Sequence, residues 1–184
     1  MPCKFTRLEI PEVILIEPRV FPDPRGYFLE SYKEKEFSDN GIDVKFVQDN
    51  HSVSQKDVLR GLHFQRKPKC QAKLVRVAKG AIFDVAVDIR KNSPTYLKWI
   101  GVELSEENHL MLYIPEGFAH GFVSLRDETH LLYKCSDDYS PQHDGGIKWD
   151  DKDICIKWPI ENPLVSEKDE KLPYVKECSA SLDF

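Results

Sequence analysis

The sequence predicts an all-β fold of the sandwich or barrel kind. Short apolar segments recur at roughly the 8–12-residue spacing that strands have in sandwiches and barrels. No long helical pattern, internal repeat or low-complexity segment interrupts them. The 184 residues are most simply one domain, which is long enough to bury a substantial core without disulfides or a structural metal.

The predicted elements follow one another from the N-terminus, and turn residues separate them. The segment 22–26 is dense in turn residues. Residues 33–38 favour one or two helical turns, for which Asn40-Gly41 would provide a left-handed cap. A polar cluster at 48–52 lies just ahead of the central strand. Extended segments are predicted at residues 13–16, 27–32, 58–65, 72–77, 82–89, 96–104, 110–114, 118–123, 131–135 and 153–158.

The strand predicted at 82–89 carries two carboxylates on an otherwise apolar segment. Together with the strand at 72–77 it flanks a Lys79-Gly80 turn, which indicates a hairpin. Strand alternation puts Phe83, Val85, Val87 and Ile89 on one face and Asp84 and Asp88 on the other. The second face is therefore expected to be wet or to line a polar cavity.

The C-terminal part becomes polar from about Glu161. We expect a body at about residues 10–160 and a tail at residues 161–184 that packs over it, both within a single domain spanning 1–184. In the tail, Ser166 and Asp169 have the spacing of a capping box, which by itself would only start a helical turn.

The central strand holds an arginine and a histidine three positions apart. Arg60 presents a permanent planar cation, whereas His63 can exchange a proton near neutral pH. On a regular strand these side chains would point to opposite faces, so one cavity could hold both only if the backbone bends at Gly61. The alternatives are a surface arginine followed by a core histidine, or a site where a proton is moved on an anionic ligand.

Charge and cysteine usage limit the partners and the compartment. A net charge of −5 and a pI near 5.7 argue against a nucleic-acid or anionic-membrane surface. No apolar run approaches the roughly 20 residues of a membrane span, and the charged N-terminus has no signal-peptide pattern. The five scattered cysteines are expected to be free thiols in a reducing cytoplasm.

Six histidines raise the question of a metal. The second position after His63 is Gln65, so the His-x-His pair typical of metal-binding double-stranded β-helices is missing. Two histidines and a carboxylate from distant strands remain an alternative, although nothing local supports it. A metal-free polar site could instead be formed by Arg25, Arg60, Lys73 and Lys168 together with Gln48, Asn50 and Tyr139.

Several segments together resemble the dTDP-4-dehydrorhamnose 3,5-epimerases from about residue 8 to residue 170. These segments are Asp23-Pro24-Arg25-Gly26, Gln48-Asp49-Asn50, residues 60–65, 83–88 and 115–122, and Trp149-Asp150-Asp151. The resemblance implies a cupin-type double-stranded β-helix (jelly roll) with short peripheral helices, forming a homodimer that needs no metal or organic cofactor. It also implies conversion of dTDP-4-dehydro-6-deoxy-glucose to dTDP-4-dehydro-rhamnose, for cell-surface polysaccharide.

The same resemblance assigns roles to individual residues. His63 would be the general base, Asp169 its orienting partner, Tyr133 the general acid, and Lys73 the group that holds the C4 oxygen. The remaining substrate-binding residues would be Arg25, Glu30, Gln48, Asp49, Asn50, Arg60, His120, Tyr139, Asp144 and Lys168. Many family members carry glutamate where this chain has Asp144, which leaves that contact open.

Two other functions remain compatible with the sequence. An epimerase acting at only C3 or only C5, or on a related 4-keto sugar, would need the same His63 and Tyr133 pair. A sugar-nucleotide-binding module without turnover would be expected to lose the base or the acid, and this chain keeps both.

Overall fold

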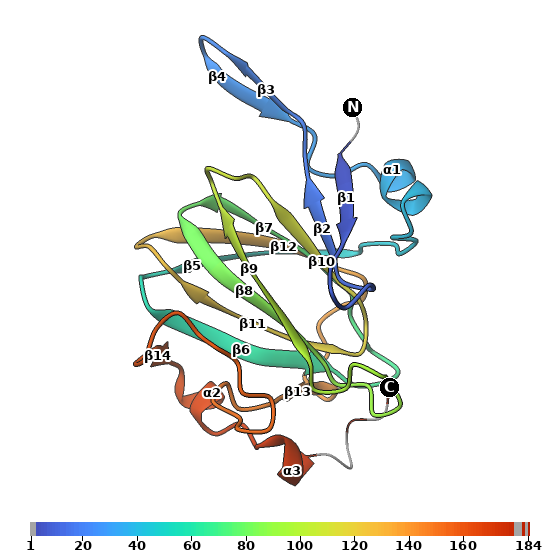
Figure 1. The fold of residues 1–184 in the computed structure, drawn as a ribbon, viewed down its shortest axis with the longest axis vertical. Coiled ribbons are helices and arrows are strands. Elements are labelled where there is room, and N and C mark those ends of the chain that lie inside the picture. Colours follow the sequence, from blue (N-terminus) through green and yellow to red (C-terminus); the bar gives the residue numbers. More distant parts are fainter. Residues whose placement is uncertain (1–2, 179–181, 183) are drawn as a thin grey trace.

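The computed structural model describes residues 3–178, 182 and 184. Within them, two six-stranded sheets face each other, and a separate two-stranded hairpin projects from one end (Figure 1). Consecutive strands often lie in different sheets. This is a double-stranded β-helix, or jelly roll, with short peripheral helices, as the resemblance implied.

The first sheet has the strand order β1-β2-β10-β7-β12-β5. Its strands are β1 (Lys4–Arg7), β2 (Ile14–Glu17), β10 (Met111–Ile114), β7 (Lys73–Lys79), β12 (Thr129–Cys135) and β5 (Gln48–Ser54). The second sheet has the order β13-β6-β11-β8-β9, and β14 pairs with β6 in parallel. Its strands are β13 (Asp144–Gly146), β6 (Val58–Gln65), β11 (Phe118–Ser124), β8 (Ala81–Asp88), β9 (Trp99–Ser105) and β14 (Leu164–Val165).

The remaining elements lie around this sandwich. They are the hairpin strands β3 (Val20–Asp23) and β4 (Gly26–Leu29) and the helices α1 (Glu34–Asp39), α2 (Glu167–Glu170) and α3 (Val175–Cys178). The helix predicted at 33–38 is confirmed as α1. Gly41, just after it, has a φ of +89°, the left-handed conformation that glycine adopts at low cost.

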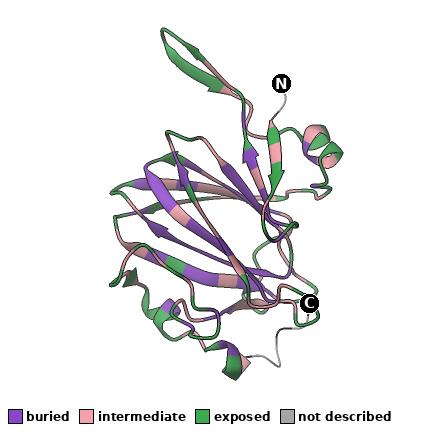
Figure 2. Ribbon diagram, viewed as in Figure 1, coloured by how far each residue is buried: buried purple, intermediate pink, exposed green. Residues whose placement is uncertain are grey.

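Three apolar clusters hold the layers together, and buried residues accordingly concentrate on the sheets in Figure 2. The cluster between the two sheets includes Val75, Ile82 and Leu112. A second cluster, with Val85, joins the outer face of the second sheet to the C-terminal tail. The third, with Phe37 of α1, covers part of the outer face of the first sheet. The tail therefore packs over the body, as expected.

The hairpin predicted around Lys79-Gly80 is wrong. A tight turn is present, and Gly80 has a φ of +81°, but β7 and β8 enter different sheets. β7 pairs with β10 and β12, whereas β8 pairs with β9 and β11. The turn passes the chain from one layer to the other because each of the two strands lies inside a different sheet and pairs on both of its edges.

Two further expectations about strands need correction. Residues 153–158 form no strand; the Asp151 carboxylate accepts hydrogen bonds from the amides of Asp153 and Ile154 and makes a turn there. Conversely, the polar cluster at 48–52 belongs to strand β5. Its polar composition hid this strand because one of its faces lines a polar cavity and the other faces outward.

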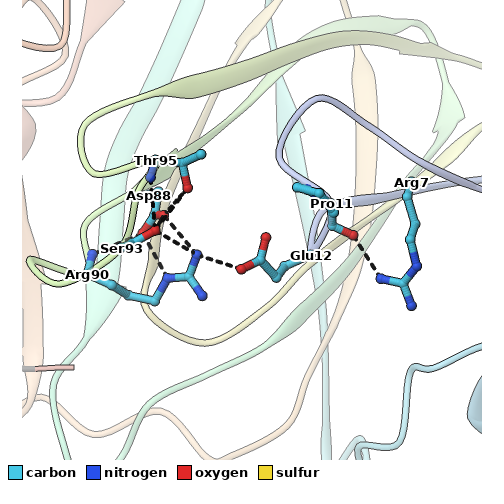
Figure 3. Close-up of polar contacts among 7 residues, drawn as sticks. All are labelled: Arg7, Pro11, Glu12, Asp88, Arg90, Ser93 and Thr95. Carbon is cyan, nitrogen blue, oxygen red and sulfur yellow. Dashed lines mark hydrogen bonds and ion pairs between the residues drawn. The ribbon is translucent and has the colours of Figure 1, made fainter.

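The face shared by Asp84 and Asp88 is dry. Strand alternation is as predicted, but both carboxylates have 0% relative exposure and point into the sandwich. Asp88 has a structural role, because its carboxylate accepts hydrogen bonds from Arg90, Ser93 and Thr95 (Figure 3). Arg90 also reaches Glu12 in the loop before β2, at 3.0 Å. Asp88 thus ties two loops to one end of the sandwich.

β6 bends at Gly61, which is the condition under which one cavity can hold both Arg60 and His63. Gly61 has a φ of +129°, and the pairing of β6 with β11 shifts register next to it, between His120 and Phe122. A Cβ at this position would meet the Cα of Gly121 at 2.5 Å, so only glycine fits. The bend turns Arg60 and His63 toward the same side of the strand.

Candidate active site

Polar side chains line two adjoining hollows between the sheets. The larger has a volume of about 440 Å³ and the smaller about 280 Å³. The residues common to both walls are His63, Lys73, Tyr133 and Lys168. We therefore treat the two hollows as one cavity, to which both sheets and the C-terminal tail contribute.

The cavity wall from the second sheet depends on the bend at Gly61. Arg60 and His63 both line the smaller hollow, although they are three positions apart on one strand. Arg60 is held by Ser54 and the Val53 carbonyl, with hydrogen bonds of 3.1 and 3.2 Å. Of the two alternatives for this strand, the structure shows the shared cavity.

His63 pairs with a buried carboxylate from α2. The His63 Nε2 and Asp169 Oδ1 atoms are 2.7 Å apart, and the Gly61 amide donates to Asp169 Oδ2 at 3.3 Å. Burial alone would raise the pKa of Asp169, but the His63 hydrogen bond, the Gly61 amide and the charge of Lys168 together lower it. The carboxylate therefore stays ionised, and its hydrogen bond orients the His63 ring and holds a proton on Nε2.

The Ser166 cap and the Asp169 pairing use different parts of the same helical turn. Ser166 Oγ accepts a hydrogen bond from the Asp169 amide at 3.1 Å, so the capping interpretation is confirmed. The Asp169 side chain is then free to point at His63. The short helix α2 is therefore capped through the Asp169 amide and holds His63 through the Asp169 carboxylate.

Lys73 projects from β7 into the centre of the cavity. Its relative exposure is 9%, and it forms no ion pair with any residue that the structure describes. Burial lowers the pKa of Lys73, while Cys135, Asp84 and Asp144 oppose that effect. A nearly buried ammonium group without a partner can bind a negatively charged oxygen of a ligand.

Tyr133 lies on β12 and also lines both hollows. Burial raises the pKa of Tyr133, with a contribution from Cys135, and Arg60 opposes the shift. The phenol therefore stays protonated through the neutral range and can donate a proton. In the antiparallel register Tyr133 is opposite Asn50 on one side and Val75 on the other, which places it in the first sheet, facing the His63 strand.

A second histidine–carboxylate pair lies deeper in the cavity. His120 Nε2 is 2.7 Å from Asp84 Oδ1, and His120 is directly opposite His63 across β6 and β11. His120 is 6% exposed. Burial lowers the pKa of His120, against the effect of Asp84, so its ring stays neutral near neutral pH.

Polar groups form a hydrogen-bonded rim around the larger hollow. Gln48 donates to Asn50 at 2.9 Å and accepts from the Tyr139 amide at 2.8 Å. Lys168 donates to Asp144 Oδ2 at 2.6 Å, and the Tyr139 hydroxyl donates to the same oxygen at 3.4 Å. The carboxylate of Asp144 thus joins α2 to the loop that carries Tyr139.

Sequence comparison identifies the family of this chain. The family model described as dTDP-4-dehydrorhamnose 3,5-epimerase matches residues 7–177. The chain belongs to this family. A dTDP-4-dehydrorhamnose 3,5-epimerase from Shigella flexneri is 57% identical over 164 residues, which cover 89% of this chain and 91% of the relative.

Solved structures of epimerases have the same fold. The dTDP-6-deoxy-D-glucose-3,5-epimerase from Legionella pneumophila, in complex with dTDP-4-keto-L-rhamnose, has a TM-score of 0.94 and 44% identity and covers 98% of this chain and 96% of its own. A 3′-monoepimerase from Streptomyces bikiniensis, in complex with dTDP-quinovose, has a TM-score of 0.89 and 34% identity, with coverage of 94% and 88%.

Most of the residues predicted for the epimerase site meet in the cavity. The larger hollow is lined by Gln48, Asn50, His63, Lys73, Tyr133, Tyr139, Asp144 and Lys168. Arg60, His120 and Asp169 join the smaller one. Within the described residues, no group of three or more histidine, cysteine, aspartate or glutamate side chains is arranged to hold a metal ion.

Three predicted substrate-binding residues lie elsewhere in this chain. Asp49 points to the outer face of the first sheet, where it pairs with Lys134 at 2.9 Å, because strand alternation separates it from Gln48 and Asn50. Arg25 is at the tip of the projecting hairpin, paired with Asp23 at 2.6 Å. Glu30 directly follows that hairpin. None of the three lines the cavity formed by the described residues.

Sequence reasoning missed several residues of the epimerase cavity. These are Ser52, Phe64, Gln71, Phe122, Cys135 and Ser166 on its walls. A period-of-two pattern on β5 could have added Ser52 to Gln48 and Asn50, and the same pattern on β12 could have added Cys135 to Tyr133. Strand alternation had singled out Asp84, but no local pattern predicts its partner His120, which comes from another strand.

Proposed function

We propose that this protein converts dTDP-4-dehydro-6-deoxy-glucose to dTDP-4-dehydro-rhamnose by inverting C3 and C5, as a step in dTDP-rhamnose biosynthesis. One observation carries the proposal. An imidazole fixed by a carboxylate, a protonated phenol and an ammonium group that has no ion pair with a described residue all line one cavity, and they come from both sheets.

The chemistry needs these three groups. The ketone at C4 acidifies the hydrogens on C3 and C5, and negative charge accumulates on the C4 oxygen as either proton leaves. In the proposed mechanism His63 removes the proton, Lys73 stabilises the developing enolate, and Tyr133 supplies a proton from the other face of the ring. No electron leaves the sugar, so the reaction itself requires no redox cofactor.

The binding groups suit a nucleoside diphosphate. Arg60 and Lys168 supply cations for an anionic ligand, and His120 adds a hydrogen-bonding ring. Tyr139 is 54% exposed at the cavity rim, where an aromatic ring can stack on a base. These roles extend the sugar-binding proposal to the whole dTDP moiety.

A hydrogen exchange experiment tests the reaction and counts its inversions. We expect the enzyme, incubated with the 4-keto substrate in heavy water, to incorporate deuterium at both C3 and C5, and trapping with a reductase to yield the rhamnose configuration. Exchange at one carbon would instead assign it the monoepimerase activity named for the Streptomyces relative. No exchange at either carbon would refute epimerisation.

The monoepimerase alternative rests on the shared fold of that relative. The identities favour the double epimerase, since this chain is 57% identical to a 3,5-epimerase and 34% identical to the monoepimerase. Both reactions use a base and an acid, so the residues of the cavity walls do not separate them. The number of carbons that incorporate deuterium separates the two reactions.

We also propose that the protein is a homodimer in which each hairpin reaches the other copy. The β3–β4 hairpin projects away from its own sandwich, and Tyr27 and Phe28 on it are 56% and 59% exposed (Figures 1 and 2). Exposed aromatic side chains on a projecting arm are typical of an interface. Arg25 and Glu30 could then serve the partner's cavity rather than their own.

Complementation tests this arrangement. Arg25→Ala and His63→Asn are each expected to be nearly inactive alone. Mixed and allowed to exchange subunits, they should regain about a quarter of the wild-type activity, because half of the dimers would be mixed and each would hold one intact site. Mixing His63→Asn with Lys73→Met, both from the same cavity wall, is the control and should regain nothing. Equal recovery in both mixtures, or none in either, would contradict the swapped arm.

The compartment and the excluded partners remain proposals. None of the helices in the described part of the chain has the length and apolarity needed to cross a bilayer. We propose a cytoplasmic enzyme that binds neither nucleic acid nor membranes, on the basis of its acidic composition and scattered free thiols.

A further inference from the structure

Asp84 is a buried carboxylate that the proposed mechanism does not use. Its relative exposure is 0%, and only one of its oxygens is occupied: Oδ1 accepts from His120 Nε2 at 2.7 Å. Oδ2 is buried without a hydrogen-bond partner among the described residues. Leaving a carboxylate oxygen buried and unpaired is costly, so a residue kept in this state indicates a role beyond packing.

The titratable groups around Lys73 come from several elements. They are Cys135 and Tyr133 on β12, Asp84 on β8, Asp144 on β13, Arg60 and His63 on β6, His120 on β11, and Lys168 and Asp169 on α2. Burial raises the pKa values of Cys135 and Tyr133, so both are neutral near neutral pH. Asp144 is paired with Lys168, and Asp169 with His63. Of the two carboxylates that raise the pKa of Lys73, Asp84 is the one without a lysine or arginine partner among the described residues.

We propose that Asp84 is a positioning residue of the epimerisation: it orients His120 toward the sugar nucleotide and supplies the buried negative charge that keeps the Lys73 ammonium protonated. The inference rests on the proposed function, because it concerns the charge of the group that would stabilise the enolate. Asp84 itself touches no reacting atom. It acts through two neighbours in the cavity, the ring of His120 and the ammonium group of Lys73.

The two roles of Asp84 use its two oxygens. The hydrogen bond at Oδ1 fixes Nε2 of His120 as the protonated nitrogen, which leaves Nδ1, without a partner among the described residues, for a ligand. The proposal places the negative charge on the carboxylate with the unpaired Oδ2, because a charge in a dry environment acts over a longer range than in water. Lys73 and His120 lie within one small hollow, so both are in reach of this effect.

The variant Asp84→Asn separates charge from hydrogen bonding. The amide can still accept from His120, but it carries no charge. Lys73 would then lose its proton at lower pH than in the wild type, so the alkaline limb of the kcat profile should move toward lower pH. Near pH 9 we expect kcat about tenfold below wild type, with a much smaller loss near pH 6.

Asp88→Asn is the matched control. Asp88 is on the same strand and face, equally buried and hydrogen-bonded, but its partners are the loop residues drawn in Figure 3 and not cavity residues. It should lower the melting temperature without moving the alkaline limb. A fall of kcat by the same factor at every pH in Asp84→Asn, with no movement of the limb, would overturn the proposal.

The protonation state of Lys73 can also be measured without turnover. In protein labelled with [15N]lysine, the Nζ signal missing from Lys73→Arg identifies Lys73, and its pH titration reports the ammonium directly. We expect Lys73 to be protonated at about pH 7 in the wild type. A neutral Lys73 there would overturn the proposal even if Asp84→Asn did not fold. If the wild type titrates as expected but does not epimerise, the proposed function fails while this electrostatic role stands.

Discussion

Replacing His63 by asparagine is expected to lower kcat for epimerisation by about a thousandfold. The change removes the ring that would accept the substrate proton, while Asp169 keeps its hydrogen bond to the Gly61 amide. Binding of dTDP should change little, because the rim formed by Gln48, Asn50 and Tyr139 stays in place. Steady-state kinetics and calorimetric titration with dTDP measure the two effects separately.

The control for this variant is His130→Asn. His130 is on β12, but it faces outward and bonds with His51 across the strand pair, away from the cavity. Its replacement should leave kcat near the wild-type value. Wild-type activity in His63→Asn would remove the imidazole from the mechanism, and a complete loss of dTDP binding would show that His63 serves binding instead.

Lys73→Met should lower kcat by about a hundredfold to a thousandfold, the range observed when one stabilising donor to a developing oxyanion is removed. Methionine keeps most of the volume and the apolar stem, so the apolar cluster between the sheets should remain packed. Because burial lowers the pKa of Lys73, the wild-type rate should decline as the pH rises through that value. That alkaline decline should disappear in the variant.

Lys134→Met makes the same chemical change on the other side of the first sheet. Lys134 pairs with Asp49 on the outer face, so its loss should leave kcat nearly unaltered. If Lys73→Met raised KM and left kcat unchanged, the ammonium would be a ground-state binding group rather than an enolate stabiliser.

Two residues of the cavity, Arg60 and His63, were predictable because they stand out locally. Arg60, Gly61 and His63 break an apolar strand, and the required bend at glycine is present in the structure. Family resemblance then supplied Tyr133, Lys73 and Asp169. Roles carried over in this way stay predictions until variants are assayed, although the structure brings these side chains into one cavity.

Other features depended on neighbours that the local sequence does not reveal. The Lys79-Gly80 turn has the composition of a hairpin, but hydrogen bonding to distant strands placed its two arms in opposite sheets. Asp49 matched a family segment, yet strand alternation turned it outward. The hairpin that carries Arg25 projects beyond the sandwich and keeps Arg25 out of the cavity of its own chain.

The sequence by itself determined the strand-rich class, most strand positions, and the glycine at which the central strand can bend between a permanent cation and a ring that exchanges protons. These follow from local alternation, turn residues and the proton chemistry of single side chains. Only the tertiary structure decided which strands share a sheet and that Asp84 bonds to His120 while its Oδ2 has no partner among the described residues. The reason is that strand pairing and the electrostatics of a dry cavity are set by residues far apart in the chain, which meet only when the two sheets close on each other.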